Sequence, residues 1–202
     1  MKKAIDFIIR LLNTAIICFC ANSFLFLRNH SSWKWIAATV IVFLLANLMP
    51  LISTQKLSSF RLRVCRHGAE CLKIFLFSTC ASIIYHIIIA FKLFPEDWKI
   101  WLISAGICIL GEAILFWNGI ICVYLTSLQL GIWQRIVGAV CGMIPVVNLV
   151  MMNSIVLTAL KEVQQEGKKE KLNRTRKDLQ LCKTKYPILL VHGVFFRDFK
   201  HF

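Results

Sequence analysis

Charged residues are scarce in this chain, and acidic residues are the scarcest. Asp and Glu number only 10 among 202 residues, all charged residues make up 17%, and 58% of the residues are hydrophobic. Soluble domains average about 45–50% apolar residues, and disordered chains have far fewer. The composition therefore excludes both an ordinary soluble domain and a disordered protein. A chain with mean hydropathy +0.69 belongs with membrane proteins.

Three recognisable sequence signals are also missing. The apolar stretch that follows the charged N-terminus has no small-residue cleavage site, which argues against a removable signal peptide. The segment from Cys65 to Cys71 contains metal-ligating residue types, but their spacing matches no standard zinc pattern, so we expect no metal and no cofactor. Six of the nine cysteines lie inside apolar runs, where Cys acts as a small hydrophobe rather than as part of a disulfide framework.

Four long apolar runs are present instead. Each approaches the roughly 20 residues that a helix needs to cross about 30 Å of hydrocarbon, and helices satisfy the backbone in that environment. Tryptophans stand at the ends of these runs, where interfacial aromatic belts lie. The runs are residues 11–27, 36–53, 74–91 and 101–125, and the tryptophans are Trp33, Trp35, Trp98 and Trp101.

Basic residues near the ends of the runs predict their orientation. Eight Lys and Arg residues lie in the N-terminus and in the loop between the second and third runs, against four in the other two loops. The side that is richer in cations is expected to be cytoplasmic. We therefore predict a multi-pass plasma-membrane protein with a cytoplasmic N-terminus and a cytoplasmic C-terminal tail.

A fifth apolar stretch, residues 136–160, is interrupted by helix breakers that include Gly138 and Pro145. A fifth crossing would carry the basic tail from Lys161 to Lys185, with nine cations and four acids, to the outside. We therefore predict a re-entrant or interfacial helical pair, followed by a helical linker that is broken or loosened at Gly167. The linker cations are expected to contact anionic lipid headgroups. Nucleic acid is not an expected partner, because the tail lacks interleaved aromatic residues.

Two ionisable residues fall inside the apolar runs. Glu112 lies near the middle of the fourth run and His86 lies in the third. Such groups are costly in a bilayer and usually face a partner or a wet cavity. The favoured interpretation is one hydrogen bond between Glu112 and His86 that fixes helix packing. The alternative is the proton or ion path of a small transporter or channel.

The last residues of the chain change character. Residues 188–191 form an apolar run typical of a buried parallel strand, and His192 and Gly193 follow it. Residues 183–202, which include the sequence KYPILLVHGVFFRDFKHF, closely resemble the start of the catalytic domain in triacylglycerol lipases of the α/β-hydrolase superfamily. With the membrane region in front of it, the chain resembles membrane-tethered lipase-like hydrolases.

The resemblance implies acyl-transfer chemistry on a lipid or other ester substrate. The backbone N–H of Val194 would donate to the oxyanion, in a loop where His192 and Gly193 are structural residues. The nucleophile, acid and base of that fold follow this strand, and no G-x-S-x-G motif occurs up to Phe202. We therefore expect a catalytically incomplete form, which arises from a truncation, a split gene or a fragment.

Together these features predict an all-α membrane protein with a stub of an α/β-hydrolase domain. The expected parts are a transmembrane domain at residues 1–160, a basic cytoplasmic linker at 161–185, and the start of the hydrolase domain at 186–202. The predicted function is to anchor a lipase- or esterase-like hydrolase in the membrane. A non-enzymatic integral membrane protein and a small transporter or channel are the alternatives.

Overall fold

The computed structural model describes residues 2–29, 32–51, 57–93, 96–141 and 145–179, and these form helices and turns without a strand. The chain divides into two units, residues 1–167 and 168–202. The helical class is confirmed for the described residues, while the predicted strand at 188–191 lies outside them. In chain order the elements are α1 (Lys2–Ala21), α2 (Phe24–Asn29), α3 (Trp33–Leu48), the 3₁₀ turn η1 (Met49–Leu51), α4 (Phe60–Leu93), α5 (Trp98–Thr126), α6 (Ile132–Cys141) and α7 (Pro145–Leu179).

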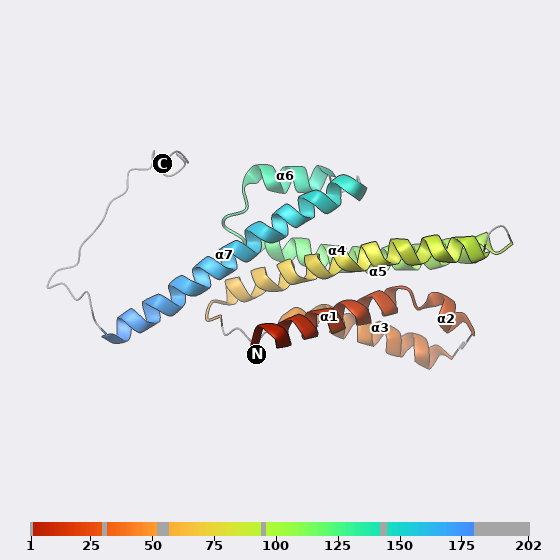
Figure 1. The fold of residues 1–202 in the computed structure, drawn as a ribbon, viewed down its shortest axis with the longest axis horizontal. Helices are drawn as coiled ribbons and strands as arrows, with labels where there is room; N and C mark the ends of the chain where they lie inside the picture. The colour runs from red at the N-terminus through yellow and green to blue at the C-terminus, as the bar shows by residue number, and fades with distance from the viewer. Residues whose placement is uncertain (1, 30–31, 52–56, 94–95, 142–144, 180–202) are drawn as a thin grey trace. The chain divides into compact units, whose positions relative to one another are not determined.

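The central feature of the first unit is the antiparallel pair of α4 and α5, which lie side by side (Figure 1). The backbones approach closely at two glycines. A Cβ added at Gly68 would lie 2.7 Å from the carbonyl oxygen of Gly119, and one added at Gly119 would lie 2.8 Å from Leu72 Cδ2. Small residues permit such close helix crossings in membrane proteins. These two glycines therefore fix the point at which the pair crosses.

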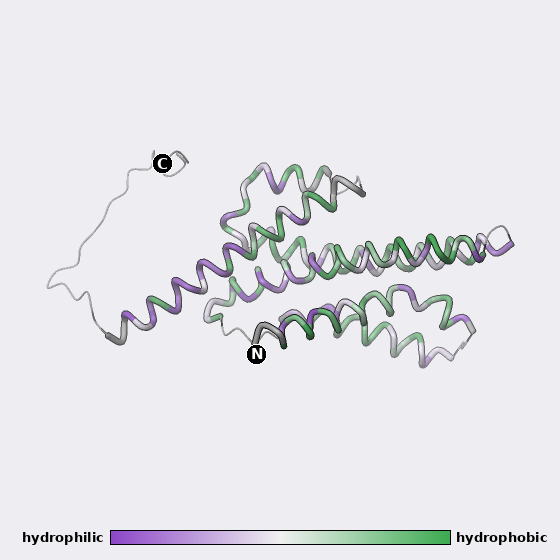
Figure 2. The backbone as a smooth tube through the Cα atoms, viewed as in Figure 1, coloured by the Kyte–Doolittle hydropathy of each residue, from purple (hydrophilic) through white to green (hydrophobic). Residues whose placement is uncertain are grey.

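Within the part of the chain that the structure describes, α4 and α5 are the helices long and apolar enough to cross a membrane. Only 28% and 22% of the residues in their most apolar 18-residue stretches are buried inside the structure. A core helix of a soluble protein would be mostly covered, so this exposure favours association with a membrane. Figure 2 shows hydrophobic residues along both helices toward the turn that connects them.

The first apolar run, residues 11–27, does not form one continuous helix. Asn22 and Ser23 separate α1 from α2. Asn22 Nδ2 donates to the carbonyl oxygen of Cys18 at 2.8 Å, and Ser23 Oγ donates to that of Cys20 at 2.8 Å. Asn and Ser side chains compete in this way with the helical hydrogen bonds of the backbone. The helix therefore ends here although the run of apolar residues continues.

The second run is also shorter as a helix than as a sequence pattern. α3 has 16 residues, which span about 24 Å at 1.5 Å per residue, against about 30 Å of hydrocarbon. The chain then tightens into η1 at Met49–Leu51. Of the four predicted crossings, the two in α4 and α5 have the full length and composition within the described residues.

The stretch at 136–160 is divided between two helices, as the helix breakers predict. α7 begins at Pro145, and the first helical position is where a missing N–H has least effect. Gly138 brings α6 against its neighbours, because an added Cβ would lie 2.6 Å from Tyr124 Oη and 2.8 Å from Ile155 Cδ1. Pro145 therefore begins the second of two packed helices, whereas Gly138 lies within the first and does not break it.

The predicted loosening of the linker at Gly167 is wrong, because α7 continues through this residue. The residues around Gly167 are mainly Lys, Glu and Gln, which favour helix and offset the roughly 1 kcal/mol that glycine costs. A Cβ added at Gly167 would lie 3.0 Å from Leu57 Cδ2. The glycine thus gives Leu57 room to pack against α7.

Two apolar clusters hold the first unit together. One joins α4, α5 and α7 and includes Leu72, Val123 and Ile155, and the other joins α1, α3, α4 and α5 and includes Ile17 and Phe43. All five side chains are buried. Packing of this kind gives the bundle a defined core in addition to its exposed apolar surface.

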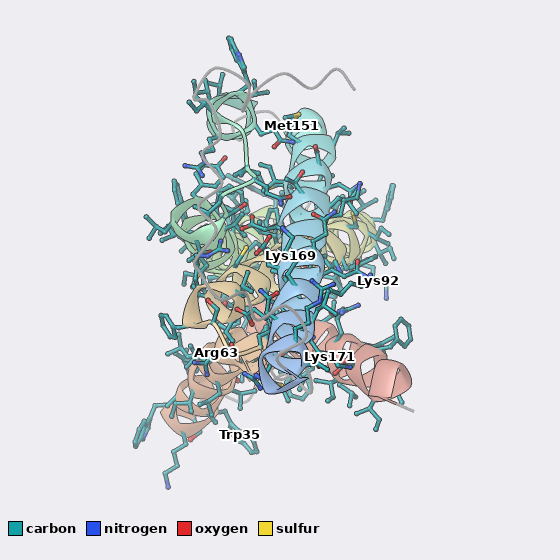
Figure 3. All side chains as sticks on the ribbon, turned by 90° about the vertical axis from the view of Figure 1, so that its left-hand side faces the viewer. Trp35, Arg63, Lys92, Met151, Lys169 and Lys171 are labelled. Carbon is teal, nitrogen blue, oxygen red and sulfur yellow. The ribbon has the colours of Figure 1, made fainter. Side chains whose placement is uncertain are left out.

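The tryptophans at the ends of the runs differ from one another. Trp33, Trp35 and Trp98 are 73%, 62% and 47% exposed, as interfacial anchors would be, and Figure 3 shows Trp35 projecting from the bundle. Trp101 instead donates its indole N–H to the carbonyl oxygen of His86 at 2.9 Å. It therefore joins α5 to α4.

Candidate functional site

Glu112 is buried on α5 where this helix packs against α4, and only 7% of the residue is exposed. Ser78 Oγ donates to Oε1 at 2.5 Å, and Thr79 Oγ1 donates to Oε2 at 3.2 Å. Both carboxyl oxygens of Glu112 thus accept hydrogen bonds from hydroxyl groups of α4. No Lys or Arg side chain in the described ranges forms an ion pair with Glu112. Its side-chain partners among the described residues are therefore neutral hydroxyl groups.

His86 lies on α4 and has partners of its own. Its Nδ1 is 2.9 Å from the carbonyl oxygen of Ser82, which can only accept, so Nδ1 donates. Its Nε2 is 3.5 Å from Ser104 Oγ. The predicted hydrogen bond between His86 and Glu112 is not formed, because hydroxyl and carbonyl groups of neighbouring residues take up the hydrogen-bonding positions of both.

Glu112 and His86 nevertheless line the same groove, which lies between α4 and α5 and is also lined by Gly138 of α6. Its volume is about 630 Å³. Glu112 is the one acidic residue that lines this groove, and no Lys or Arg lines it. Small-molecule sites typically have such a volume and combine apolar walls with a few polar groups. The aromatic side chains in its walls are Phe75, Phe116, Trp117 and Tyr124.

The metal-ligating residue types between Cys65 and Cys71 share a helix but not a site. His67 and Cys71 face α5, where Asn118 Nδ2 lies 3.4 Å from His67 Nε2 and 3.8 Å from Cys71 Sγ. Glu70 pairs with α1, and Cys65 is part of the apolar core. Among the described residues, no three His, Cys, Asp or Glu side chains are grouped closely enough to hold a metal ion.

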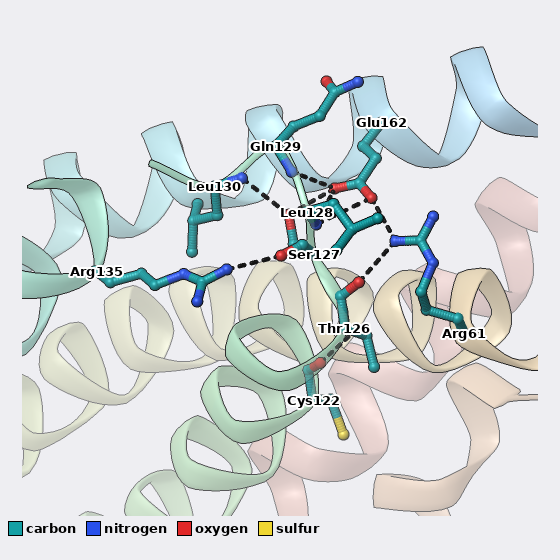
Figure 4. Close-up of polar contacts among 9 residues, drawn as sticks. All are labelled: Arg61, Cys122, Thr126, Ser127, Leu128, Gln129, Leu130, Arg135 and Glu162. Carbon is teal, nitrogen blue, oxygen red and sulfur yellow. Dashed lines mark hydrogen bonds and ion pairs between the residues drawn. The ribbon is translucent and has the colours of Figure 1, made fainter. Parts of the chain in front are cut away.

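A second polar site, which sequence reasoning missed, centres on Glu162 of α7 (Figure 4). Its side chain is 1% exposed, and Arg61 Nη1 lies 2.6 Å from Oε1. Ser127 Oγ donates to Oε2 at 2.6 Å. The backbone N–H groups of Leu128 and Gln129 donate to the same oxygen at 3.1 Å and 3.2 Å. The carboxylate therefore receives charged, hydroxyl and backbone donors together.

The surrounding contacts connect this site to four helices. Arg61 Nη1 also donates to the carbonyl oxygen of Thr126 at 2.7 Å, and Arg135 Nη2 donates to that of Ser127 at 2.8 Å. The start of α4, the end of α5, the start of α6 and the middle of α7 thus meet at Glu162. No pattern within one element indicates this, because Arg61 and Glu162 are 101 residues apart.

The ionisation of Glu162 follows from these contacts. Burial alone would raise its pKa, but the hydrogen bonds from Ser127, Arg61 and the two backbone N–H groups outweigh burial and hold the pKa below its ordinary value. Glu162 is therefore a carboxylate at neutral pH.

A third polar contact joins α1 to α4. Arg10 Nε lies 2.6 Å from Glu70 Oε2, and Arg10 Nη2 donates to Oε1 at 2.9 Å. The hydrogen bond from Nη2 is charge-assisted, and such bonds are stronger than those between neutral groups. Lys73 Nζ lies 3.7 Å from the same carboxylate. This contact also escaped sequence reasoning, since its partners lie 60 residues apart.

The residues that the hydrolase resemblance singled out, His192, Gly193 and Val194, lie outside the described residues. In comparisons with known proteins, no protein-family model, no curated protein and no solved structure matches the chain. The class of the protein is therefore defined by its own geometry, a helical bundle with two helices able to cross a membrane.

Proposed function

We propose that residues 1–160 form a membrane anchor with four crossings and a cytoplasmic N-terminus. The observation that carries this proposal is the exposed apolar surface of α4 and α5, which would be unfavourable in water and is suited to hydrocarbon. Large exposed apolar side chains occur along both helices and include Phe77, Ile83, Ile84, Ile87, Ile103, Ile109, Leu110 and Ile114.

α1 and α3 supply the other two crossings in this proposal. Leu11, Phe19, Val40 and Leu45 on these helices are at least half exposed, which supports contact with lipid. α1 and α4 begin, and α3 and α5 end, at the same end of the first unit (Figure 1). Most of the loop and terminal cations belong to this end. Placing it in the cytoplasm therefore agrees with the positive-inside rule.

α6 is proposed to lie at the membrane surface. Ile132 and Trp133 are 76% and 78% exposed, and Ile136 and Val140 are also exposed. Gly138 is buried on the opposite side against α5 and α7. A short helix that has one exposed apolar face and one face packed against the protein is suited to the membrane–water interface.

Thiol labelling tests this topology. In a Cys182→Ser chain, we expect Glu96→Cys, in the turn between α4 and α5, to react with an impermeant maleimide in intact cells. Thr175→Cys, on the part of α7 that follows the anchor, should react only after permeabilisation. The Cys182→Ser chain itself gives the background from the remaining thiols. Labelling of Thr175→Cys in intact cells, or release of the protein by alkaline carbonate, would contradict the proposal.

We further propose that the anchor serves a lipase-like α/β-hydrolase at the inner face of the plasma membrane, with a lipid or other ester as substrate. The support is the resemblance of residues 183–202, through which Val194 N–H would be an oxyanion donor. The basic helical segment that precedes these residues supports a position near anionic headgroups.

The coding sequence beyond codon 202 tests the hydrolase proposal. A continuation that encodes G-x-S-x-G, then an acid and a histidine, would support it, whether in frame or after a frameshift. The longest such product should be labelled by a fluorophosphonate probe in the membrane fraction, and replacement of the motif serine by Ala should abolish the labelling. Unrelated sequence beyond codon 202 would favour a non-enzymatic membrane protein.

A further inference from the structure

We propose that the groove between α4 and α5 binds a lipophilic organic cation, with the carboxylate of Glu112 as its counterion. The proposal rests on the membrane anchor proposed above for the surroundings of the groove. It concerns a ligand that neither anchoring nor ester hydrolysis requires.

The charge of the groove is the first argument. Glu112 is buried, and the donors that it receives from Ser78 and Thr79 are neutral hydroxyl groups. No basic side chain lines the groove or pairs with Glu112 in the described ranges. Buried charges in proteins are normally paired, and an ionisable group at membrane depth marks a functional site by default. The groove therefore has one uncompensated negative charge when Glu112 is ionised.

His86 does not pair with Glu112, because both of its ring nitrogens have other partners. Its Nδ1 donates to the carbonyl oxygen of Ser82, and its Nε2 lies 3.5 Å from Ser104 Oγ. His86 therefore contributes polarity to the wall of the groove, and Glu112 remains its only anionic group.

The aromatic walls are the second argument. The ring centroids of Phe75 and Phe116 are 5.3 Å apart, and those of Phe116 and Trp117 are 5.6 Å apart. These rings line the same groove as Glu112, together with Tyr124. Aromatic faces attract cations, most strongly when water is excluded. A carboxylate among aromatic rings thus offers two kinds of contact that a cation can use and a neutral molecule cannot.

The size of the groove selects among cations. A volume of about 630 Å³ suits a drug-sized molecule rather than a metal ion. Because most of the lining is apolar, a ligand must carry apolar groups to match it. A weakly hydrated cation with aryl or alkyl groups pays the smallest desolvation free energy among cations when it leaves water. A neutral acyl chain would fill the same space and leave Glu112 without a counterion.

Tetraphenylphosphonium is the probe that tests this proposal, because its charge is permanent and its phenyl groups match the groove. We expect the purified full-length chain in detergent to bind it saturably at one site per chain. Glu112→Gln should weaken this binding by at least about tenfold, equivalent to about 1.4 kcal/mol. Glu112→Asp should retain part of it, since it keeps the charge. Glu96→Gln is the matched control, because it makes the same change at an exposed residue outside the groove.

Neutral triphenylphosphine oxide separates charge recognition from apolar partitioning. Equal binding of the phosphonium ion and the oxide by the unaltered chain would overturn the proposal, even if Glu112→Gln failed to fold. Uptake that does not saturate, or that Glu112→Gln and Glu96→Gln leave equally unchanged, would also overturn it. Because binding is measured in detergent, a positive result would stand if thiol labelling contradicted the proposed topology, so the two proposals fail separately.

Discussion

At the scale of single residues, Glu162 illustrates how one carboxylate can organise a helical bundle. Its oxygens accept from the guanidinium of Arg61, the hydroxyl of Ser127 and two consecutive backbone N–H groups. These two N–H groups belong to the segment between α5 and α6. Because they lie outside both helices, they are not part of a helical hydrogen-bond pattern. Glu162 thus accepts hydrogen bonds from the backbone N–H groups of this segment and thereby attaches α7 to it.

Replacement of Glu162 by Gln should therefore destabilise the bundle. The amide keeps one acceptor but loses the ion pair with Arg61, and it brings a donor toward the N–H groups of Leu128 and Gln129. We expect a loss of about 2 kcal/mol, seen as an apparent unfolding temperature lower by roughly 4–8 °C for a chain of this size. Thermal unfolding in mild detergent measures this change. Glu96→Gln should shift the temperature little, and an equal shift in both variants would contradict this role of Glu162.

The same residue gives the stability a predictable dependence on pH. The pKa of Glu162 is lower in the folded protein than its ordinary value, which is about 4.3. Its contribution is therefore complete above the ordinary value and is lost as the pH falls through the lowered native one. The difference in unfolding temperature between the unaltered chain and Glu162→Gln should be constant from pH 7 to about pH 5 and shrink below about pH 4. A difference that grows on acidification would contradict the assignment.

At the scale of helices, the pairing of α4 with α5 depends on Gly68 and Gly119. Gly68→Ala would place a methyl group 2.7 Å from both the carbonyl oxygen of Gly119 and Cys122 Cβ. The backbones must then separate, at a cost of about 1–3 kcal/mol. Gly106→Ala is the matched control on α5, because nothing lies within 4 Å of its added Cβ. We expect thermal unfolding to show a lower temperature for Gly68→Ala and an equal or higher one for Gly106→Ala. The reverse order would show that the crossing point lies elsewhere.

How much of these helices the sequence could predict depends on the range of the interactions. Apolar composition over about 20 residues predicts α4 and α5, and Pro145 correctly divides α6 from α7. The break after α1 was missed because hydrophobicity dominates that run, whereas the side-chain hydrogen bonds of Asn22 and Ser23 end the helix. The continuity of α7 through Gly167 was missed because single-residue propensity was given too much weight.

In the candidate sites, too, local sequence signals identify some residues, while their partners become apparent only in the fold. Glu112 and His86 could be found from sequence, because an ionisable residue is conspicuous in an apolar run. Their partners could not be found, since serine and threonine are common in such runs and the choice among them depends on helix rotation. Glu162 was hidden for the opposite reason, because an acid within a charged segment has no distinguishing pattern until the fold brings Arg61 to it.

At the scale of the whole molecule, positive charge is the feature that relates the chain to its surroundings. The chain carries a net charge of +14, and the described part of the second unit contributes exposed cations on α7 that include Lys168, Lys169 and Lys171. Figure 3 shows the last two among the side chains of α7. Each such residue near an anionic bilayer contributes about 1 kcal/mol of attraction.

This attraction should protect the tail from protease in anionic vesicles. We expect the endoproteinase that cleaves after Glu to cut at Glu170 more slowly in vesicles with phosphatidylglycerol than in pure phosphatidylcholine. The protection should fade in 0.5 M salt, where screening shortens the electrostatic range to about 4 Å. Replacement of Lys168, Lys169 and Lys171 by Gln should also remove most of it.

The paired replacement of Lys92 and Lys99 by Gln, near the turn between α4 and α5, is the control and should leave the cleavage rate unchanged. Equal cleavage rates in the two kinds of vesicle would exclude headgroup contact by this segment.

The ion pair between Arg10 and Glu70 has a consequence for biosynthesis. The ribosome adds Arg10 sixty residues before Glu70, so α1 and α3 are complete before this ion pair can form. In the anchor that we propose, Arg10 therefore reaches the membrane before the carboxylate of Glu70 is available to it. Nascent chains that stall before codon 70 should accordingly be inserted less stably than chains that include α4, which extraction by alkaline carbonate would measure.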